Sequence, residues 1–215
     1  RFFTDIKLNQ ETVVAHCPNT GSMMGLLDEG NEVFISKNDD PKRKLKYTLE
    51  IIKVKKNLVG VNTHFANKIA FHGLSNNLVK EVKNSNNIKP EVFFDKETRF
   101  DFLVEKDNQK TFVEVKNVTL SRKDKLAEFP DAVTSRGSKH LKTLIEATKK
   151  GYKTYLLFLV QIQGVTDFKI AKDIDKEYYE NYKLAKKAGV KFLAYRCKIS
   201  SKEIKIEKKI KIIND

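Results

Sequence analysis

Hydrophobic and polar residues alternate in short runs over the first 63 residues, and turn-forming residues separate the runs. Alternation with period two is typical of strands that bury one face. Five such runs stand out: FFTDIKL, ETVVAHC, NEVFIS, KLKYTLEIIKV and NLVGVN. Several short strands joined by turns indicate a small barrel, and an OB-type β-barrel is the obvious candidate.

From about residue 64 the pattern changes to helical spacing and longer apolar strands. HFANKIAFHGL and NNLVKEVKN carry apolar residues three and four positions apart, which predicts two helices. Three strand candidates follow between Ile88 and Val118. The change of period falls between residues 63 and 75, so we expect residues 1–65 to form the barrel domain and residues 66–215 to form an α/β domain.

The last third of the chain alternates helices with strands. SKHLKTLIEATKKG places Leu141 and Leu144 on one helical face and ends at Gly151. TYLLFLV is apolar throughout, as expected of a strand buried on both faces. DIDKEYYENYKLAKKAG predicts a helix between Asp173, a possible cap, and Gly189. VKFLAYRCKI is a further strand, and KEIKIEKKIKI is either a solvent-facing strand or a frayed basic tail.

The stretch TRFDFLVEKDNQKTFVEVKNV, residues 98–118, is the segment best suited to carry chemistry. Two strand-like runs flank a polar loop centred on Asp107 and Asn108. If those two residues form the loop, the numbers of paired residues sum to 215, so Asp101 lies opposite Glu114. Side chains alternate along a strand, and this places Asp101, Glu114 and Lys116 on one face.

Two opposed carboxylates repel each other, because the Cβ atoms of directly opposed residues lie about 5 Å apart. A cation between them removes that repulsion, and Mg²⁺ takes two carboxylates together with waters and a phosphate. The metal polarises a phosphate oxygen and lowers the pKa of a bound water, while Lys116 orients that water or stabilises the transition state. The alternative is an exposed hairpin that carries Asp and Glu by chance. The large hydrophobic residues of both strands favour the catalytic interpretation.

The net charge changes the picture toward a phosphate-bearing partner. The chain has 42 Lys and Arg residues against 28 Asp and Glu residues, a net charge of +14. Cationic side chains release the condensed counterions of nucleic acid, so this charge favours nucleic-acid binding. Lys far outnumbers Arg and Asn is abundant. That composition also follows from an A/T-biased genome, and charge alone leaves the choice open.

Composition excludes several other classes of protein. Hydrophobic residues make up 40% of the chain, which is enough for a core and excludes wholesale disorder. No apolar run is long enough to span a bilayer, and no signal peptide precedes the first strand. Cys17 and Cys197 are far apart and lack zinc spacing, so we expect reduced thiols in a cytoplasmic protein. The chain begins with Arg rather than Met, and we expect a short natural N-terminus before it.

A second polar cluster lies where a loop meets the helix that contains Leu141. It contains Asp131, Arg136, Lys139 and His140. Cationic side chains near a helix N-terminus suit a phosphate, because the free backbone N–H groups add to the attraction. The alternative is a buried ion pair between Asp131 and Arg136 that fixes the loop. The residues alone do not decide between the two.

Longer motifs connect these segments with a known family. HCPNTGSMMGLL (16–27), GVNTHFAN, RFDFLV, EVKNVTL and EFPDAVTSRGSKHLKTL (128–144) occur in the order expected. Over nearly its whole length the chain resembles the sugar fermentation stimulation protein A family. The resemblance implies an N-terminal OB-type β-barrel followed by an α/β domain of the PD-(D/E)XK nuclease type. Its departures are Thr98, where Ser is usual, and Asp95-Lys96, which replaces a typical Tyr-Gly.

The resemblance also implies the function and its residues. Asp101, Glu114 and Lys116 match the nuclease motif, Asp101 and Glu114 as ligands of Mg²⁺ or Mn²⁺, with Glu91 as a possible extra ligand. We therefore expect a DNA-binding protein with a divalent-metal nuclease-type site acting on phosphodiester bonds. The alternatives are a non-catalytic transcriptional regulator of sugar (maltose) metabolism genes and a module that binds RNA or responds to sugar through the barrel. The residues predicted to contact DNA or phosphate are Arg99, Arg136, Lys139 and His140.

Overall fold

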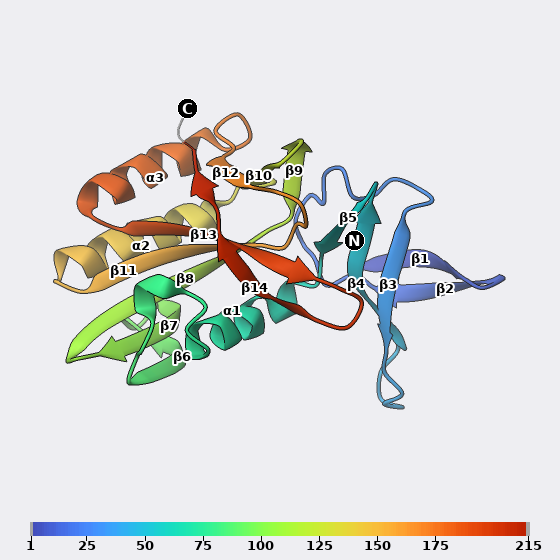
Figure 1. The fold of residues 1–215 in the computed structure, drawn as a ribbon, viewed down its shortest axis with the longest axis horizontal. Helices are drawn as coiled ribbons and strands as arrows, with labels where there is room; N and C mark the ends of the chain where they lie inside the picture. The colour runs from blue at the N-terminus through green and yellow to red at the C-terminus, as the bar shows by residue number, and fades with distance from the viewer. Residues whose placement is uncertain (1, 214–215) are drawn as a thin grey trace.

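The structure is a computed structural model that describes residues 2–213. Figure 1 shows a β-rich N-terminal part at one end and a larger α/β part at the other. The strands form three sheets, of five, four and six strands. No helix among residues 2–213 combines the length and the apolar character needed to cross a membrane.

The N-terminal sheet confirms the five strands expected from the alternating pattern. They are β1 (Phe3–Leu8), β2 (Glu11–His16), β3 (Glu32–Lys37), β4 (Tyr47–Val54) and β5 (Asn57–Gly60). The order is β1-β2-β4-β3, and β5 pairs with β4. Two of the turns contain residues in the left-handed region, Asn9 with φ 57° and Lys55 with φ 54°. Within residues 2–213 no ladder joins β1 to β3, so these pairings leave the sheet open rather than closed into a ring.

The six-stranded sheet forms the centre of the second half. Its order is β14-β13-β11-β8-β7-β6. β6–β7, β7–β8 and β13–β14 are antiparallel, whereas β8, β11 and β13 are parallel. The sheet is therefore mixed, with a parallel centre and antiparallel edges, as the α/β domain expected from the sequence allows. The strands are β6 (Asn87–Phe93), β7 (Arg99–Lys106), β8 (Gln109–Val118), β11 (Lys153–Val160), β13 (Lys191–Ile199) and β14 (Ile204–Lys209).

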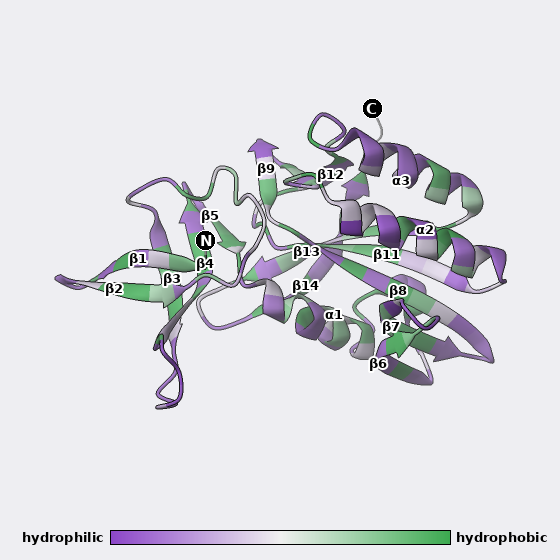
Figure 2. Ribbon diagram, turned by 180° about the vertical axis from the view of Figure 1, so that it is seen from behind, coloured by the Kyte–Doolittle hydropathy of each residue, from purple (hydrophilic) through white to green (hydrophobic). Residues whose placement is uncertain are grey.

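Helices cover both faces of this sheet, as Figure 2 shows for α1 on one side and for α2 and α3 on the other. They are α1 (Ala66–Ser75), α2 (Ser135–Lys149) and α3 (Lys176–Ala188). The centre strand β11 belongs to two hydrophobic clusters: Leu157 packs with the residues of α1, and Leu156 and Phe158 pack with those of α2 and α3. This double burial is the reason for the continuous apolar run that the sequence showed.

Two expectations about helices are wrong. NNLVKEVKN contains only a 3₁₀ turn, η2 (Lys80–Val82), in place of the expected helix. A second 3₁₀ turn, η1 (Thr63–Phe65), lies directly before α1. Asn77 and Asn84 on either side take left-handed conformations, with φ 59° and 58°, and so stop an α-helix. The cap of α3 is Asp175, which accepts from the backbone N–H of Tyr178 at 2.9 Å, because Asp173 pairs with Arg122 instead.

A small four-stranded sheet completes the fold. It joins β9 (Leu120–Lys123), β10 (Leu126–Phe129), β12 (Asp167–Ile170) and β15 (Lys211–Ile212). Three of its strands, β9, β10 and β12, have no counterpart among the predicted elements. The C-terminal segment is thus divided between two sheets, β14 in the large one and β15 in the small one. It is a strand rather than a frayed tail, and Ile206 is 2% exposed.

Asp131 ties the loop before α2 to the N-terminal half. Its Oδ2 accepts from the backbone N–H of Ser22 at 2.9 Å, and Ser22 Oγ donates to the Asp131 carbonyl at 2.7 Å. Gly21 is required for this approach, since a Cβ there would lie 2.4 Å from Asp131 Oδ2. Among residues 2–213 no ion pair joins Asp131 to Arg136, so the predicted alternative of such a pair is wrong.

Replacing Asp131 tests this connection. Asp131→Ala leaves the N–H groups of Ser22 and Met23 without their charged acceptor, and we expect a loss of about 2 kcal/mol in the free energy of unfolding. Urea denaturation followed by circular dichroism measures it. Asp124→Ala, on an exposed turn, is the control and should change the value by less than about 0.5 kcal/mol. Equal stability of the two variants would contradict the assignment.

Candidate functional site

The predicted hairpin register is confirmed. β7 and β8 pair from Phe102↔Val113 to Lys106↔Gln109. The loop is the two-residue turn Asp107–Asn108, with φ 48° and 65°, as a type I′ turn requires. Asp101 and Glu114 therefore occupy the first positions beyond the paired segment, where the two strands separate.

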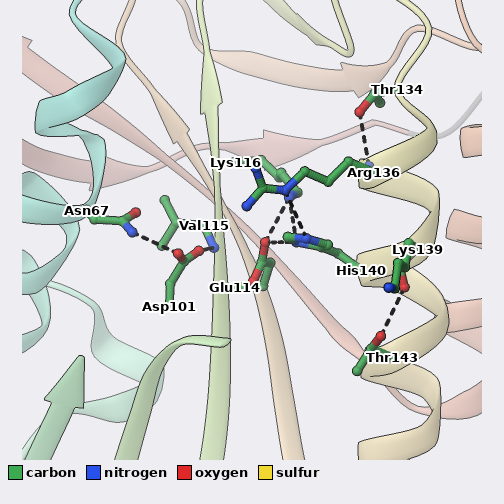
Figure 3. A network of polar contacts seen from close by, with 11 residues as sticks. Asn67, Asp101, Glu114, Val115, Lys116, Thr134, Arg136, Lys139, His140 and Thr143 are labelled. Carbon is green, nitrogen blue, oxygen red and sulfur yellow. Dashed lines mark hydrogen bonds and ion pairs between the residues drawn. The ribbon is translucent and has the colours of Figure 1, made fainter. Parts of the chain in front are cut away.

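Asp101 is held at this point by one contact from each of two elements. Its Oδ2 accepts from the backbone N–H of Val115 at 2.7 Å, and its Oδ1 accepts from Asn67 Nδ2 of α1 at 2.7 Å. A side-chain carboxylate thus accepts from a strand N–H beyond Phe102↔Val113, the last pair of the β7–β8 ladder. The contact wedges the carboxylate between β8 and the first turn of α1 (Figure 3).

Glu114 is directed to α2 instead. It is 2% exposed, and its Oε1 accepts from Lys116 Nζ at 2.8 Å and contacts His140 Nδ1. Lys116 Nζ also lies 3.1 Å from His140 Nδ1. Arg136, one turn earlier on α2, donates from Nε to His140 Nε2 at 3.4 Å. Figure 3 shows this chain of contacts from Arg136 through His140 to Glu114 and Lys116.

The two carboxylates differ in their electrostatic state. Burial and then the charge of Glu114 raise the pKa of Asp101 above its usual 3.8, although Val115 and Asn67 oppose the shift. Burial also pushes the pKa of Glu114 upward, but Lys116 and His140 outweigh it and hold that pKa below 4.5. Glu114 is therefore a compensated anion, whereas Asp101 forms no ion pair within residues 2–213, and the charge of Lys116 only partly offsets the rise in its pKa.

A divalent cation fits this donor set. Hard cations prefer carboxylate oxygens and complete their coordination with water or phosphate. Both polar contacts of Glu114 use Oε1, so Oε2 takes part in neither. Within residues 2–213 no group of three or more His, Cys, Asp or Glu side chains is gathered for a metal. The protein would therefore supply two carboxylates to the metal, and solvent or substrate would supply the remaining ligands.

The remaining predicted residues differ in whether they contact the cluster around Glu114. Glu91 is on β6, with φ 55°, and its carboxylate pairs with Arg99 at 2.8 Å. Lys139 has a side chain 61% exposed, 3.8 Å from Glu97. Arg136 and His140 are the predicted phosphate residues that reach the Glu114 cluster. Sequence reasoning missed Asn67 as a partner of Asp101, although GVNTHFAN was among the motifs that stood out.

Comparisons with known proteins follow the same division of the chain. The family model described as the SfsA N-terminal OB domain matches residues 1–61. The model described as the sugar fermentation stimulation protein RE domain matches residues 64–203. The sugar fermentation stimulation protein homolog of Pelagibacter ubique is 84% identical over 214 residues, covering 100% of this chain and 92% of its own length. The homolog of Pseudoalteromonas atlantica is 42% identical over 217 residues, covering 99% and 92%.

A solved structure matches the whole chain. It is SfsA of Pyrococcus furiosus in complex with Ca²⁺, 25% identical in sequence, with a TM-score of 0.90. The match covers 100% of this chain and 91% of that chain. The OB domain followed by a nuclease-type α/β domain is thereby confirmed.

Removing the charge of either carboxylate should have opposite effects on stability. The raised pKa of Asp101 means that its ionisation destabilises the fold, so stability from this group is lost as the pH rises through that pKa. Asp101→Asn keeps one oxygen for the Val115 N–H, and its NH₂ group can donate to the oxygen of Asn67 once that amide has turned over, so we expect a higher melting temperature at pH 7. The gain should shrink below the ordinary pKa of 3.8.

Glu114→Gln is the matched contrast. It leaves Lys116 and His140 beside a neutral amide, and we expect a loss of about 3 kcal/mol at pH 7. Because the pKa of Glu114 is lowered, the wild-type advantage should fade as the pH drops below 4.5. Calorimetric melting of both variants from pH 3 to pH 7 measures these trends. If both variants shifted in the same direction at pH 7, the assigned difference between the carboxylates would be wrong.

Proposed function

The chain belongs to the sugar fermentation stimulation protein family, and from this membership we propose that it binds DNA and carries a divalent-metal nuclease-type site acting on phosphodiester bonds. One observation carries the proposal. Asp101 and Glu114 lie where β7 and β8 separate, and Lys116 Nζ is 2.8 Å from Glu114.

The raised pKa of Asp101 supports the metal, because Lys116 offsets the cost of its burial and of the neighbouring Glu114 charge only in part. A buried carboxylate next to another carboxylate is costly unless a positive charge is supplied. A bound Mg²⁺ or Mn²⁺ would polarise a phosphate oxygen and lower the pKa of a coordinated water. Asp101 and Glu114 Oε2 are the groups that would hold it. The Ca²⁺ of the Pyrococcus furiosus relative is a cation of the same oxygen-seeking class.

Glu91 remains a prediction as a further ligand. The register places it across from Asp101, because its neighbours pair as Pro90↔Phe102 and Val92↔Phe100. Its ion pair with Arg99 would have to open for it to reach the metal. Opening of that pair would also free the Arg99 guanidinium to contact a phosphate.

The cationic side chains have distinct tasks in this proposal. Lys116 Nζ lies on the Glu114 side of the pair, where it can orient an attacking water or stabilise charge in the transition state. Arg136 and Lys139 lie in the first turns of α2, where free backbone N–H groups also favour a phosphate. His140 accepts from Arg136 at Nε2, so a neutral ring carries its proton on Nδ1 and donates it to Glu114.

A non-catalytic DNA-binding regulator of sugar metabolism genes is the second candidate. The contacts of Glu114 favour it, since Lys116 and His140 already satisfy Oε1 without a metal. In that case Asp101 and Glu114 only position the DNA backbone. DNA retention in the presence of Mn²⁺ without any cleavage would separate this candidate from the nuclease.

Metal binding tests the proposal most directly. We expect isothermal titration calorimetry to detect Mn²⁺ binding at millimolar concentration, and Asp101→Asn and Glu114→Gln to remove it. No heat above dilution with wild-type protein would exclude the metal site. Cleavage of plasmid and single-stranded DNA with Mn²⁺ is the companion assay. Lys116→Ala should retain the metal but lower the rate by about 100-fold or more.

The salt dependence of DNA binding tests the assignment of the phosphate contacts. Each cation that touches phosphate contributes about 0.9 to the slope of log K against log salt. We expect Arg136→Ala to weaken binding evenly across sequences and to lower that slope by about 1. Lys183→Ala, on α3 and paired with Glu180, is the control and should leave the slope unchanged. An unchanged slope for Arg136→Ala would remove this residue from the interface.

A further inference from the structure

One face of α1 exposes aromatic side chains beside the candidate site. Phe65, at its N-cap, is 39% exposed, and Phe71 is 41% exposed. Lys68 lies between them, with Nζ 5.2 Å from the centroid of the Phe65 ring. We call Phe65, Lys68 and Phe71 the α1 face. Large exposed aromatic rings on a helix usually mark a binding surface when they are grouped.

Phe71 is placed near Asp101 through its helical neighbour Asn67. Asn67, which donates to Asp101, precedes Phe71 by four residues, so the two side chains are neighbours on the helix surface. The ring of Phe71 also stacks on Phe102, with centroids 6.1 Å apart and planes at 29°. Because Phe102 is buried, this contact packs one side of the Phe71 ring, and the ring as a whole stays 41% exposed. The Asn67 contact is what relates this exposed ring to Asp101.

The charge around this face suits a polyanion. The chain has 28 acidic residues, but none lies between Glu50 and Glu81, a stretch that includes all of α1. Lys68 and His72 are the ionisable side chains of the helix itself. Two carboxylates from other elements lie near the helix, because Asp101 accepts from Asn67 and Glu203 interacts with the charge of His72. The helix itself offers aromatic rings interleaved with cations, the combination that binds single-stranded nucleic acid, whose unpaired bases stack on the rings.

We propose that the α1 face stacks unpaired bases of a nucleic-acid strand whose phosphodiester lies at Asp101 and Glu114. The substrate class is then single-stranded or locally unpaired DNA. In an intact duplex the bases are already stacked on each other and cannot reach the ring. The inference rests on the proposed function and adds the class of strand that the site selects.

A tryptophan at position 71 reports the stacking directly, because the chain has no Trp of its own. Phe71→Trp keeps an aromatic ring over Phe102, and we expect oligo(dT) to quench its fluorescence. Leu184→Trp is the matched control, because Leu184 is 57% exposed on α3, away from the site. The titration is made in EDTA, so that cleavage plays no part, and anisotropy of a labelled oligo(dT) records binding in the same samples.

A second pair of variants measures the contribution to affinity. Phe71→Leu keeps the apolar contact with Phe102 but removes the π-face, and Phe71→Tyr keeps both. We expect Phe71→Leu to weaken oligo(dT) binding about five-fold or more, and Phe71→Tyr to stay within two-fold of wild type. Binding to a blunt, fully paired linear duplex should change less than two-fold in either variant. Melting temperatures of both variants confirm that they are folded.

The outcomes separate this inference from the function on which it rests. If oligo(dT) binds but leaves the fluorescence of Phe71→Trp unchanged, the α1 face is not the stacking surface, and DNA binding survives. Equal weakening of oligo(dT) and duplex by Phe71→Leu also overturns the inference. If neither oligo(dT) nor duplex binds the wild-type protein at low salt, the proposed function and the inference are both wrong.

Discussion

The separation of β7 from β8 after Phe102↔Val113 is the constraint on which the site depends. Asp101 takes the N–H of Val115 with its own carboxylate, so a strand N–H beyond the ladder keeps a partner. This contact fixes Asp101 on one strand while Glu114 continues on the other. Without it the two strands could pair further, and the site would close into ordinary sheet.

The sheet can hold such a pair because its two faces are covered by different helices. Asn67 reaches Asp101 from α1, and His140 reaches Glu114 from α2, so each carboxylate finds a polar partner on its own side. The result is unequal, because Lys116 and His140 hold the pKa of Glu114 below its usual value, whereas the pKa of Asp101 stays raised. Strain of this kind is typical of binding and catalytic sites, which give up stability for function.

The position of α2 depends in turn on the N-terminal half. Asp131 accepts from Ser22 just before the helix begins, and Thr134 caps its first turn by accepting from Gly137 at 3.0 Å. The loop of the OB domain and the start of α2 are therefore set together. The contact between the two halves therefore fixes where the basic N-terminal end of α2 lies relative to the carboxylate pair. Ser22 and Asp131, which make this contact, belong to the long motifs of residues 16–27 and 128–144.

The sequence by itself determined the local features. Alternation predicted the five N-terminal strands, a two-residue turn predicted the register of Phe102 with Val113, and an apolar run predicted the double burial of β11. These follow from backbone geometry within a few residues. Only the tertiary structure decided the partners of the site, Asn67 with Asp101 and His140 with Glu114, which are 34 and 26 residues apart. It also decided the small sheet, because pairing between distant strands depends on how the whole chain packs and leaves no periodic signal along it.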